Sequence, residues 1–543
     1  MRTTATPRLR FFLPLRNRHS SFASSYNERQ PLLFDHQQKQ KMTVWTAAAA
    51  CISGLGGFLF GFDLGVVGGL LIAPSFQSHF GIDPNDKIRE ADINGNVVAI
   101  LQIGCLFGSL AGTLTADKAG RRWSIIFSAV VFSVGGILQV VAANLGMLYA
   151  GRLIAGLGVG ALSMLVPVYV AEIAHQSQRG LLGGLWNFFI AAGLAMSYWT
   201  NYIVQRVVTD DQDNALWQVP LIVQTIPGGI LLVGMLMLFE TPRQLVAHGH
   251  LDQAKQVIAK TRGWSISDPR VETELQYIHN GMQEQLAMNE SRSTWHTWRR
   301  VFSRDNMRRL LIGSALQAFQ QLTGTNVINY YSPIIFRSIG LSSNTAELLA
   351  TGVYGLVKML VTLVAFSWMV DRYGRRKLLI GGGTALCTCM LSVAICVSTL
   401  PIQTTSTTTD VSPASYTGIV FMYLYAICFA LSWGPIPWIY CSEIYPMALR
   451  AKSTSVTTAI NWVFNAVVGK FSPLLLAQST IGTYIFFGLF CLVSSVFTFF
   501  YVPETKGKTL EEMQVLFERS ARSSSDNPPT DIENEVNAQK HAR

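Results

Sequence analysis

The sequence predicts an all-α membrane protein in which twelve transmembrane helices form two pseudo-symmetric six-helix bundles. Of its 543 residues, 50% are hydrophobic and only 14% are charged, whereas a soluble domain is about one quarter charged. The apolar residues lie in continuous runs of about 20, the length that crosses roughly 30 Å of hydrocarbon. A charged cassette between two such runs, Asp117-Lys-Ala-Gly-Arg-Arg122, returns as Asp371-Arg-Tyr-Gly-Arg-Arg376. This repeat predicts two halves of similar structure.

Each predicted span is a continuous apolar run, and a continuous run indicates a helix rather than a barrel strand. Glycines inside the runs favour close packing between helices. We expect spans at 44–72, 93–116, 123–142, 147–171, 181–204, 216–239, 308–336, 346–370, 377–399, 416–441, 452–477 and 481–502.

The repetition extends beyond the cassettes. Glu172 is followed by Arg179 after the first cassette, and Glu443 is followed by Arg450 after the second, at the same spacing. Two similar halves in a membrane are a common construction of secondary transporters. The sequence therefore indicates membrane transport.

Positive charge is unevenly distributed in a chain whose net charge is +10. Lysines and arginines concentrate in the loops on one side of the spans, which the positive-inside rule assigns to the cytosol. Both termini are then cytosolic. The expected divisions are a disordered cytosolic tail over 1–43, a six-helix bundle over 44–239, a cytosolic helical connector over 240–307, a second six-helix bundle over 308–502 and a cytosolic tail over 503–543.

The first tail is rich in arginine and serine and has no acidic residue before Glu28. This composition resembles that of an organellar transit peptide. A disordered cytosolic tail and a true start at Met42 are the alternatives.

Other classes of function are excluded by the motifs that the chain lacks. The cysteines mostly lie inside spans, with neither metal-ligand spacing nor a disulfide framework. The soluble segments contain no nucleotide-binding loop, metal-ligand cluster or nucleophile motif. We therefore expect no enzyme activity and no cofactor. The basic loops are explained by topology in a lipid bilayer, so nucleic acid is not an expected partner.

Charged residues gather where the spans reach the cytosolic side. Such groups can close an inner gate as an ion-pair network in one conformation and separate in another. The alternative is that the positive charge anchors topology only. The matched spacing in both halves favours a gate formed by Arg121, Glu172, Arg179, Arg375, Glu443 and Arg450.

Two further charges, Asp63 and Arg152, lie inside spans. Asp63 is about 20 residues into the first helix, or roughly 30 Å along it. Arg152 is about six residues into the fourth span, which runs inward, so it lies roughly 9 Å from the outer edge. At this similar depth the two side chains can pair, and an ionisable group inside a membrane is a functional candidate. A proton switch and a static brace between helices remain the two interpretations.

The seventh span carries a dense stripe of polar residues. Gln317, Gln320, Gln321 and Asn326 lie within it, and Asn461 lies in the eleventh span. Amides both donate and accept hydrogen bonds, which suits a neutral ligand rich in hydroxyls. Trp438 follows Gly434-Pro-Ile-Pro, which is expected to break the tenth helix, and its indole offers a face for a sugar ring. Hydrogen bonding between helices without a ligand is the alternative.

The chain resembles a sugar porter of the major facilitator superfamily from about 44 to 516, with similarity to the fungal quinate-permease-like branch. The motifs that carry the resemblance are Gly61-Phe-Asp-Leu-Gly65, Gly120-Arg-Arg122, Gly151-Arg152, Arg179-Gly180, Gln320-Gln-Leu-Thr-Gly-Thr-Asn326, Gly374-Arg-Arg376, Gly434-Pro-Ile-Pro-Trp438 and Pro503-Glu-Thr-Lys-Gly507. The resemblance implies the major facilitator fold, alternating access and a functional monomer.

The resemblance also implies roles for particular residues. Gln320, Gln321, Asn326, Trp438 and Asn461 match sugar-contacting positions, with Gln317 near them. Asp63 and Arg152 match the proton-coupling pair of sugar symporters. We therefore expect a plasma-membrane carrier that moves a monosaccharide together with a proton.

The chain departs from the family pattern at two positions in the expected binding site. Asn187 stands where sugar porters usually have a glutamine, and Lys358 lies near a position that is often asparagine. A lysine facing the pore would attract an anionic substrate, whereas a lysine that snorkels or pairs elsewhere would not. A quinate or sugar-acid permease is therefore the first alternative. A facilitative carrier and a transporter-like nutrient sensor are the others.

Overall fold

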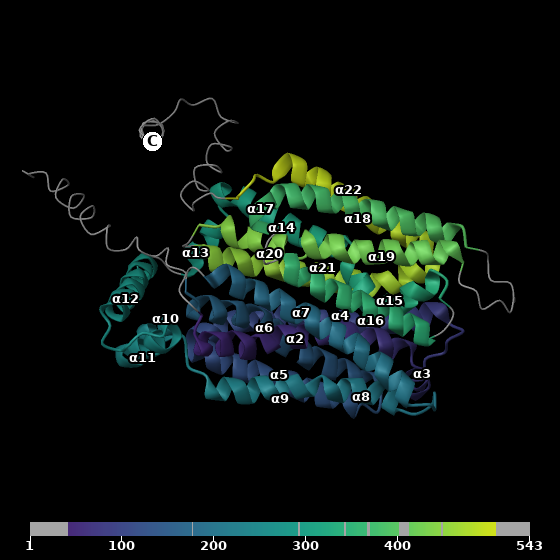
Figure 1. The fold of residues 1–543 in the computed structure, drawn as a ribbon, viewed down its shortest axis with the longest axis horizontal. Helices are drawn as coiled ribbons and strands as arrows, with labels where there is room; N and C mark the ends of the chain where they lie inside the picture. The colour runs from purple at the N-terminus through teal and green to yellow at the C-terminus, as the bar shows by residue number, and fades with distance from the viewer. Residues whose placement is uncertain are drawn as a thin grey trace, which may run out of the picture. The chain divides into compact units, whose positions relative to one another are not determined.

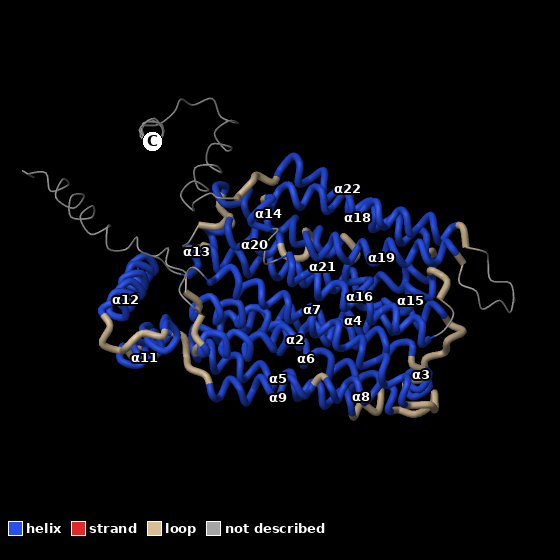
Figure 2. The backbone as a smooth tube through the Cα atoms, in the orientation of Figure 1, coloured by secondary structure: helices blue, strands red, loops and turns tan. Residues whose placement is uncertain are grey.

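The computed structural model describes residues 42–175, 178–290, 294–341, 344–365, 370–400, 412–446 and 449–506. In these ranges the regular elements are helices (Figure 2). The expectations for most of the two tails concern 1–41 and 507–543, which lie outside the described residues. Thr43, which was assigned to the first tail, is the N-cap of the first described helix.

The first half is a bundle of long helices that occupies the lower part of Figure 1. It contains α2 (Val44–Ile72), the short α3 (Pro74–His79), α4 (Lys87–Ala119), α5 (Arg121–Val140), α6 (Leu145–Ile173), α7 (Arg179–Val207), α8 (Ala215–Val223) and α9 (Thr225–Met237). The predicted span 216–239 corresponds to α8 and α9, which meet at Gln224.

The second half occupies the upper part of the same view (Figure 1). It contains α14 (Arg304–Leu322), α15 (Thr325–Ser338), α16 (Asn344–Val364), the short α17 (Val370–Tyr373), α18 (Arg375–Ser398), α19 (Pro413–Leu431), α20 (Ile436–Glu443), α21 (Arg450–Gln478) and α22 (Thr480–Tyr501). The break between α19 and α20 lies at the Gly-Pro-Ile-Pro motif, where the sequence predicts it.

Ten helical segments of the described chain are long and apolar enough to cross a membrane. The other two predicted spans correspond to α7 and to α14 with α15. The seventh span is not one helix, because Gly324 has φ +88° between α14 and α15, and Tyr331 departs from helical geometry inside α15. A positive φ is accessible to glycine at little cost, so the break depends on this residue.

Glycines let the helices of the first half approach closely. A Cβ atom added to Gly104 or Gly108 of α4 would overlap the carbonyl oxygen of Leu153 or Leu157 in α6. A Cβ atom added to Gly61 of α2 would overlap the Ile190 carbonyl of α7. In lipid no hydrophobic effect drives helices together, so they associate through van der Waals packing, and small residues allow the close approach that this packing needs.

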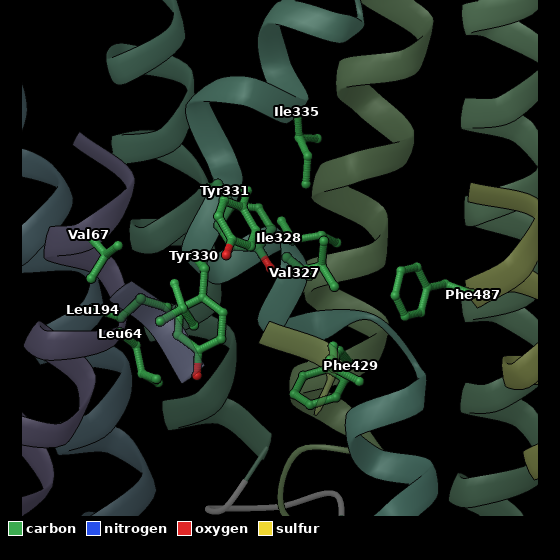
Figure 3. Close-up of a cluster of buried hydrophobic side chains, with 14 of the residues drawn as sticks. Leu64, Val67, Leu194, Val327, Ile328, Tyr330, Tyr331, Ile335, Phe429 and Phe487 are labelled. Carbon is green, nitrogen blue, oxygen red and sulfur yellow. The ribbon is translucent and has the colours of Figure 1, made fainter. Parts of the chain in front are cut away.

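In the described part of the chain the most extensive contacts between the two halves are those of α4 with α21, α7 with α16 and α2 with α15. At the last of these seams a cluster of apolar and aromatic side chains fills the interior. Figure 3 shows Tyr330 and Tyr331 of this cluster between Leu64 and Val67 on one side and Val327 and Ile328 on the other. The interior between the halves is therefore filled largely by hydrophobic side chains, with polar groups at defined points.

A helical connector joins the halves and consists of α10 (Pro242–Ala247), α11 (Leu251–Arg262), α12 (Pro269–Glu290) and α13 (Thr294–Val301). The Thr43 and Thr46 hydroxyls donate to the Thr261 carbonyl at 3.0 and 2.9 Å. Arg262 Nη1 donates to the Ile173 carbonyl at 2.8 Å, which satisfies a free carbonyl at the end of α6. We call this side of the molecule the connector end and the opposite side the far end.

Candidate functional site

The break in the tenth span leaves backbone carbonyls without helical partners. Gln320 of α14 satisfies them, because its Nε2 donates to the Trp433 and Gly434 carbonyl oxygens, both at 2.8 Å. Non-helical backbone at membrane depth is tolerated only where such partners exist. Gln320 therefore supports the fold in addition to any role in binding.

Asn461 of α21 links two amides of α14. Its Nδ2 donates to Gln317 Oε1 at 2.7 Å and to Gln320 Oε1 at 2.9 Å. All three side chains are at least 96% buried, since none exceeds 4% exposure. The sequence predicted these residues as one group, and the structure brings them together.

A second group of amides lies around the break in the seventh span. Asn326 Nδ2 donates to Gln321 Oε1 at 2.6 Å and to Asn465 Oδ1 at 3.0 Å. Asn329 Nδ2 donates to Asn326 Oδ1 at 3.0 Å. Because Gly324 turns the chain between Gln321 and Asn326, residues from two helices meet in one network.

Gln102 of α4 connects this network to the first half. Its Nε2 donates to Tyr330 Oη at 2.7 Å, and its Oε1 accepts from Asn465 Nδ2 at 3.2 Å. Tyr198 of α7 adds a second link by donating to the Asn329 carbonyl at 2.7 Å. Sequence analysis missed Gln102, although a single amide in an otherwise apolar stretch of a span is a detectable signal.

Lys358 of α16 lies at the edge of the same network. Its Nζ donates to Asn329 Oδ1 at 3.0 Å and stands 5.2 Å from the ring centre of Phe429 and 5.9 Å from that of Tyr354. The side chain is buried, so it does not snorkel to a membrane surface. Among the residues that the structure describes, no carboxylate forms an ion pair with it.

Two predicted binding residues stand apart from the amide network. Trp438 in α20 and Asn187 in α7 are both half-buried. No hydrogen bond in the described part of the chain joins either side chain to the amides above. Trp462, next to Asn461, is buried and packs edge-on against Phe60 of the first half, with ring centres 5.3 Å apart.

Asp63 of α2 and Arg152 of α6 form an ion pair in the interior of the first half. Arg152 Nη1 lies 2.6 Å from Asp63 Oδ1, and both residues are 1% exposed. Arg152 Nε donates to the Val97 carbonyl at 3.1 Å, and Nη1 reaches Gln139 Oε1 at 3.5 Å. Asp63 Oδ2 has no hydrogen-bond partner among the described residues. The pair is therefore buried with one carboxylate oxygen unsatisfied.

At the connector end, each repeated cassette forms the same ion pair. Arg121 Nη2 lies 3.2 Å from Glu172 Oε1, and Arg375 Nη2 lies 3.0 Å from Glu443 Oε1. The glutamates of the two halves thus pair with the arginines of the preceding cassettes. Each pair joins helices of its own half.

The predicted gate also includes Arg179 and Arg450, and the structure describes side-chain contacts for Arg450 alone of these two. Arg450 Nη2 donates to the Tyr445 carbonyl at 3.4 Å. Burial lowers the pKa of Arg450, and the nearby charge of Glu443 opposes this shift. The side chain of Arg179 lies outside the described residues.

A second carboxylate completes the arrangement in each half. Glu240 accepts from the backbone N–H groups of Arg121 and Arg122 at 3.1 Å each, and Glu504 accepts from those of Arg375 and Arg376 at 2.9 and 3.1 Å. A carboxylate at a helix N-terminus satisfies free N–H groups and the helix dipole. Burial raises the pKa of Glu240, although these hydrogen bonds oppose the shift.

Threonines next to these carboxylates tie them to the ion pairs. The hydroxyl of Thr241 donates to Glu172 Oε2 at 2.6 Å, and that of Thr505 donates to Glu443 Oε2 at 2.7 Å. The site predictions omitted these residues. The Glu-Thr dipeptide that follows the last helix of each half was the signal that could have identified them.

Two six-helix bundles that enclose buried polar groups and are joined by a connector define a secondary transporter with the major facilitator fold. The model of the family described as "Sugar (and other) transporter" matches residues 49–517. The chain therefore belongs to the sugar transporter family, and this confirms the resemblance inferred from its motifs.

Similar sequences are permeases of fungi. The chain is 33% identical over 480 residues to the quinate permease of Neurospora terricola, a match that covers 88% of the chain and 89% of that relative. It is also 33% identical over 473 residues to a probable quinate permease of Aspergillus fumigatus, which covers 86% of each. These relatives confirm that the chain is a transporter and not an enzyme.

Similar solved structures are those of XylE from E. coli. A partially occluded inward open conformation of this xylose transporter matches with a TM-score of 0.72 and 26% identity, covering 86% of the chain and 99% of XylE. The proton:xylose symporter XylE bound to 6-bromo-6-deoxy-D-glucose matches with a TM-score of 0.71 and 28% identity, covering 87% and 99%. The major facilitator fold predicted from the sequence is thereby confirmed.

Proposed function

We propose that the protein moves a small polyhydroxylated solute, in the first place a monosaccharide, together with a proton across the plasma membrane by alternating access. The observation that carries this proposal is the buried amide network formed by α14, α15 and α21 and linked to the first half through Gln102. Because the positive-inside rule assigns the connector end to the cytosol, the far end faces outward.

The amides are suited to exchange partners with a ligand. The side chains of Gln317, Gln321, Asn326 and Asn461 hydrogen-bond mainly to other amides. Sugar hydroxyls donate and accept in the same way, so a ligand can replace amide–amide bonds without leaving polar groups unsatisfied. Trp438 supplies a half-buried aromatic face for the apolar side of a ring.

Proton coupling is assigned to Asp63 and Arg152. Protonation of Asp63 would remove the charge that holds Arg152 and would let α2 and α6 separate. An ionisable pair this deep in a span is costly to keep without a function. The similarity to XylE, which is described as a proton:xylose symporter, also supports this assignment.

The paired charges at the connector end are assigned a conformational role. Arg121 with Glu172, and Arg375 with Glu443, brace the cytosolic ends of the two halves. Hydrogen bonds from Gln102 of the first half to Tyr330 and Asn465 of the second half join the two halves in the interior of the protein. We assign this arrangement to an inward-facing conformation, because Lys470 of α21 pairs with Asp92 of α4 and joins the two halves at the far end.

A permease for quinate or a sugar acid is the second candidate. It is favoured by the names of the fungal relatives and by the buried cation of Lys358 near the amides. A facilitative carrier would use the same amides without proton movement. A nutrient sensor would bind the solute without transporting it.

The test is uptake in yeast that lacks its own hexose carriers, with external pH recorded while glucose, xylose, galacturonate or quinate is added. If the protein is a symporter, the external medium should become more alkaline when a transported solute is added, and Asp63→Asn should abolish this rise in pH. The matched control is Asp211→Asn, which changes an exposed aspartate outside the helices. Uptake without any pH change would contradict proton coupling, and binding without uptake would favour the sensor.

A further inference from the structure

We infer that residues 94–102 of α4 couple the proton site to the solute site, and that Gln102 is the positioning residue through which they do so. This role rests on the proton symport proposed above and adds the part of the chain that links its two sites. A symporter needs such a link, because binding of either ligand must change the affinity for the other.

The proton pair is attached to α4 where this helix contacts α6. Arg152 Nε donates to the Val97 carbonyl at 3.1 Å, while the same guanidinium group holds Asp63. The two helices have no spare room along this stretch, since a Cβ atom added to Gly104 would overlap the carbonyl oxygen of Leu153. Because close-packed helices transmit displacements, a change at Arg152 is felt by α4.

Gln102 lies five residues after Val97 in α4, or about 7.5 Å along the helix. It closes a ring of three hydrogen bonds with the second half. Gln102 Nε2 donates to Tyr330 Oη at 2.7 Å, Tyr330 Oη donates to Asn465 Oδ1 at 2.9 Å, and Asn465 Nδ2 donates to Gln102 Oε1 at 3.2 Å. We call these three side chains the interhalf ring. None of them exceeds 1% exposure, so a broken bond in the ring leaves a buried polar group unsatisfied.

The interhalf ring shares an atom with the amides that are proposed to bind the solute. Asn465 Oδ1 also accepts from Asn326 Nδ2 at 3.0 Å, and Asn326 Nδ2 donates to Gln321 Oε1 at 2.6 Å. A solute hydroxyl that accepts from Asn326 would remove one of the two donors on Asn465 Oδ1. Because hydrogen bonds in a network polarise one another, solute binding then changes the strength of the ring.

Tyr331 adds a contact to α4 on the same side. Its hydroxyl donates to the Gly469 carbonyl of α21 at 2.9 Å and lies 3.4 Å from the Asn94 carbonyl of α4. The segment 94–102 is therefore in contact with the second half at Asn94 and Gln102, with the Arg152 contact at Val97 between them.

The helix that carries Asp63 meets the second half differently. α2 faces α15 with apolar side chains such as Leu64 and Val67, which belong to the same buried cluster as Tyr330 (Figure 3). Apolar contacts are non-directional, so α2 can shift against α15 without losing a hydrogen bond. Hydrogen bonds are directional, so a shift of α4 against α15 and α21 breaks the ring.

Two events thus act on one segment of α4. Protonation of Asp63 releases Arg152 and changes the load on the Val97 carbonyl, while solute binding changes the interhalf ring. Since both sites bias the position of the same segment, the proton and the solute influence each other. Without the amide of Gln102, α4 would leave the second half whatever the state of the solute site. Protons or solute would then cross alone.

The experiment measures protons and labelled solute taken up together in yeast that lacks its own hexose carriers. The probe is whichever of glucose, xylose, galacturonate and quinate the wild type takes up fastest. The variants are Gln102→Leu, Tyr330→Phe and the double variant. Gln102→Glu is the conservative change, because its protonated carboxyl group can make both hydrogen bonds of the amide.

Two matched controls remove buried polar groups outside the interhalf ring. Gln224, between α8 and α9, is 0% exposed, and neither polar atom of its amide has a partner among the described residues. Tyr484 is also buried, and its hydroxyl bonds to Ser338 within the second half at 2.9 Å. Gln224→Leu and Tyr484→Phe should keep the wild-type ratio of protons to solute.

Gln102→Leu and Tyr330→Phe should each lose most of the proton movement per solute. The double variant should lose no more than Gln102→Leu, because both changes break the same ring. Gln102→Glu should keep the coupling at acidic external pH. In purified wild type, pH should change the affinity for the solute by about 5- to 150-fold, the usual range of coupling between two sites, and Gln102→Leu should remove most of this difference.

A wild-type ratio of protons to solute in Gln102→Leu would overturn the role of Gln102 and leave the proposed symport intact. Equal loss of coupling in Gln224→Leu would also overturn it, since any buried amide would then serve. If Gln102→Leu does not fold, Tyr330→Phe decides, because it removes a single hydroxyl, and unchanged coupling in that variant would overturn the inference. Wild-type uptake without proton movement would refute the proposed symport itself and the link with it.

Discussion

The contribution of the buried Asp63–Arg152 ion pair to stability can be measured by removing one partner and then both. Removing one partner of a buried pair leaves an unpaired charge and typically costs about 3–5 kcal/mol, whereas replacing both partners can be nearly neutral. Arg152→Leu should therefore lower the melting temperature strongly. Adding Asp63→Asn to Arg152→Leu should recover most of this loss, measured by thermal unfolding in detergent. A double variant as unstable as the single one would show that the arginine acts mainly through Val97 and Gln139.

The neighbouring glutamines Gln320 and Gln321 should behave differently when truncated. Gln320 satisfies two backbone carbonyls at the helix break, so Gln320→Ala should cost about 1–3 kcal/mol of stability as well as affinity. Gln321 accepts from Asn326, which has a second acceptor in Asn465. Gln321→Ala should therefore raise KM with a smaller change in melting temperature. Equal losses of stability would contradict this division of roles.

At the scale of elements, the contact between α4 and α6 depends on the absence of side chains at glycine positions. Gly108→Ala places a methyl group against the Leu157 carbonyl and should reduce the folded fraction or separate the helices. Gly183 in α7 has open space around it, so Gly183→Ala is the matched control. That control should be neutral or stabilising by up to about 1 kcal/mol, because alanine favours helix. Similar thermal stability of the two variants would contradict the close seam.

Glycines are also needed at the residues that precede α5 and α18. Gly120 and Gly374 have φ values of +88° and +87°, and both stand beside a carboxylate. Replacing either glycine by alanine would combine an unfavourable backbone conformation with a clash. The repeated Gly-Arg-Arg motif therefore has a backbone explanation in addition to its charge.

At the scale of the whole molecule, an ion pair at the far end joins the halves. Lys470 Nζ of α21 lies 2.6 Å from Asp92 Oδ1 of α4 and also donates to Asn96 Oδ1 at 2.7 Å. Both partners are partly exposed, and such pairs contribute up to about 1 kcal/mol. Lys470→Ala should therefore shift the population towards opening of the far end by up to roughly fivefold.

Spin labels at Ile88 and Gln478, both exposed near the far end, would measure this shift as a longer distance. The control is Lys255→Ala, because the Lys255–Glu272 pair lies within the connector. The exchanged pair Asp92→Lys with Lys470→Asp should restore the distance of the wild type. An unchanged distribution in Lys470→Ala would show that the pair does not influence the conformational equilibrium.

Much of the fold followed from features that are local in the sequence. The first span, 44–72, coincides with α2, and the break of the tenth helix follows from its two prolines. The break of the seventh span was not predicted, because a single glycine inside a span is also compatible with a continuous helix. The space beside Gly324 is limited by Phe487, which lies far away in the sequence, so that an added Cβ atom would lie 2.9 Å from its ring.

By itself, the sequence determined the number of spans, the two similar halves and the family, because hydrophobic length, repeated motifs and charge are properties of contiguous residues. It also singled out several of the amides that the structure joins by hydrogen bonds, among them Gln317, Gln320 and Asn461. Only the tertiary structure decided their partners: Gln320 with free backbone carbonyls, Gln102 with Asn465 across the halves, and Lys358 with Asn329. These pairings depend on distances between helices that are remote in the chain, and no local pattern encodes such distances.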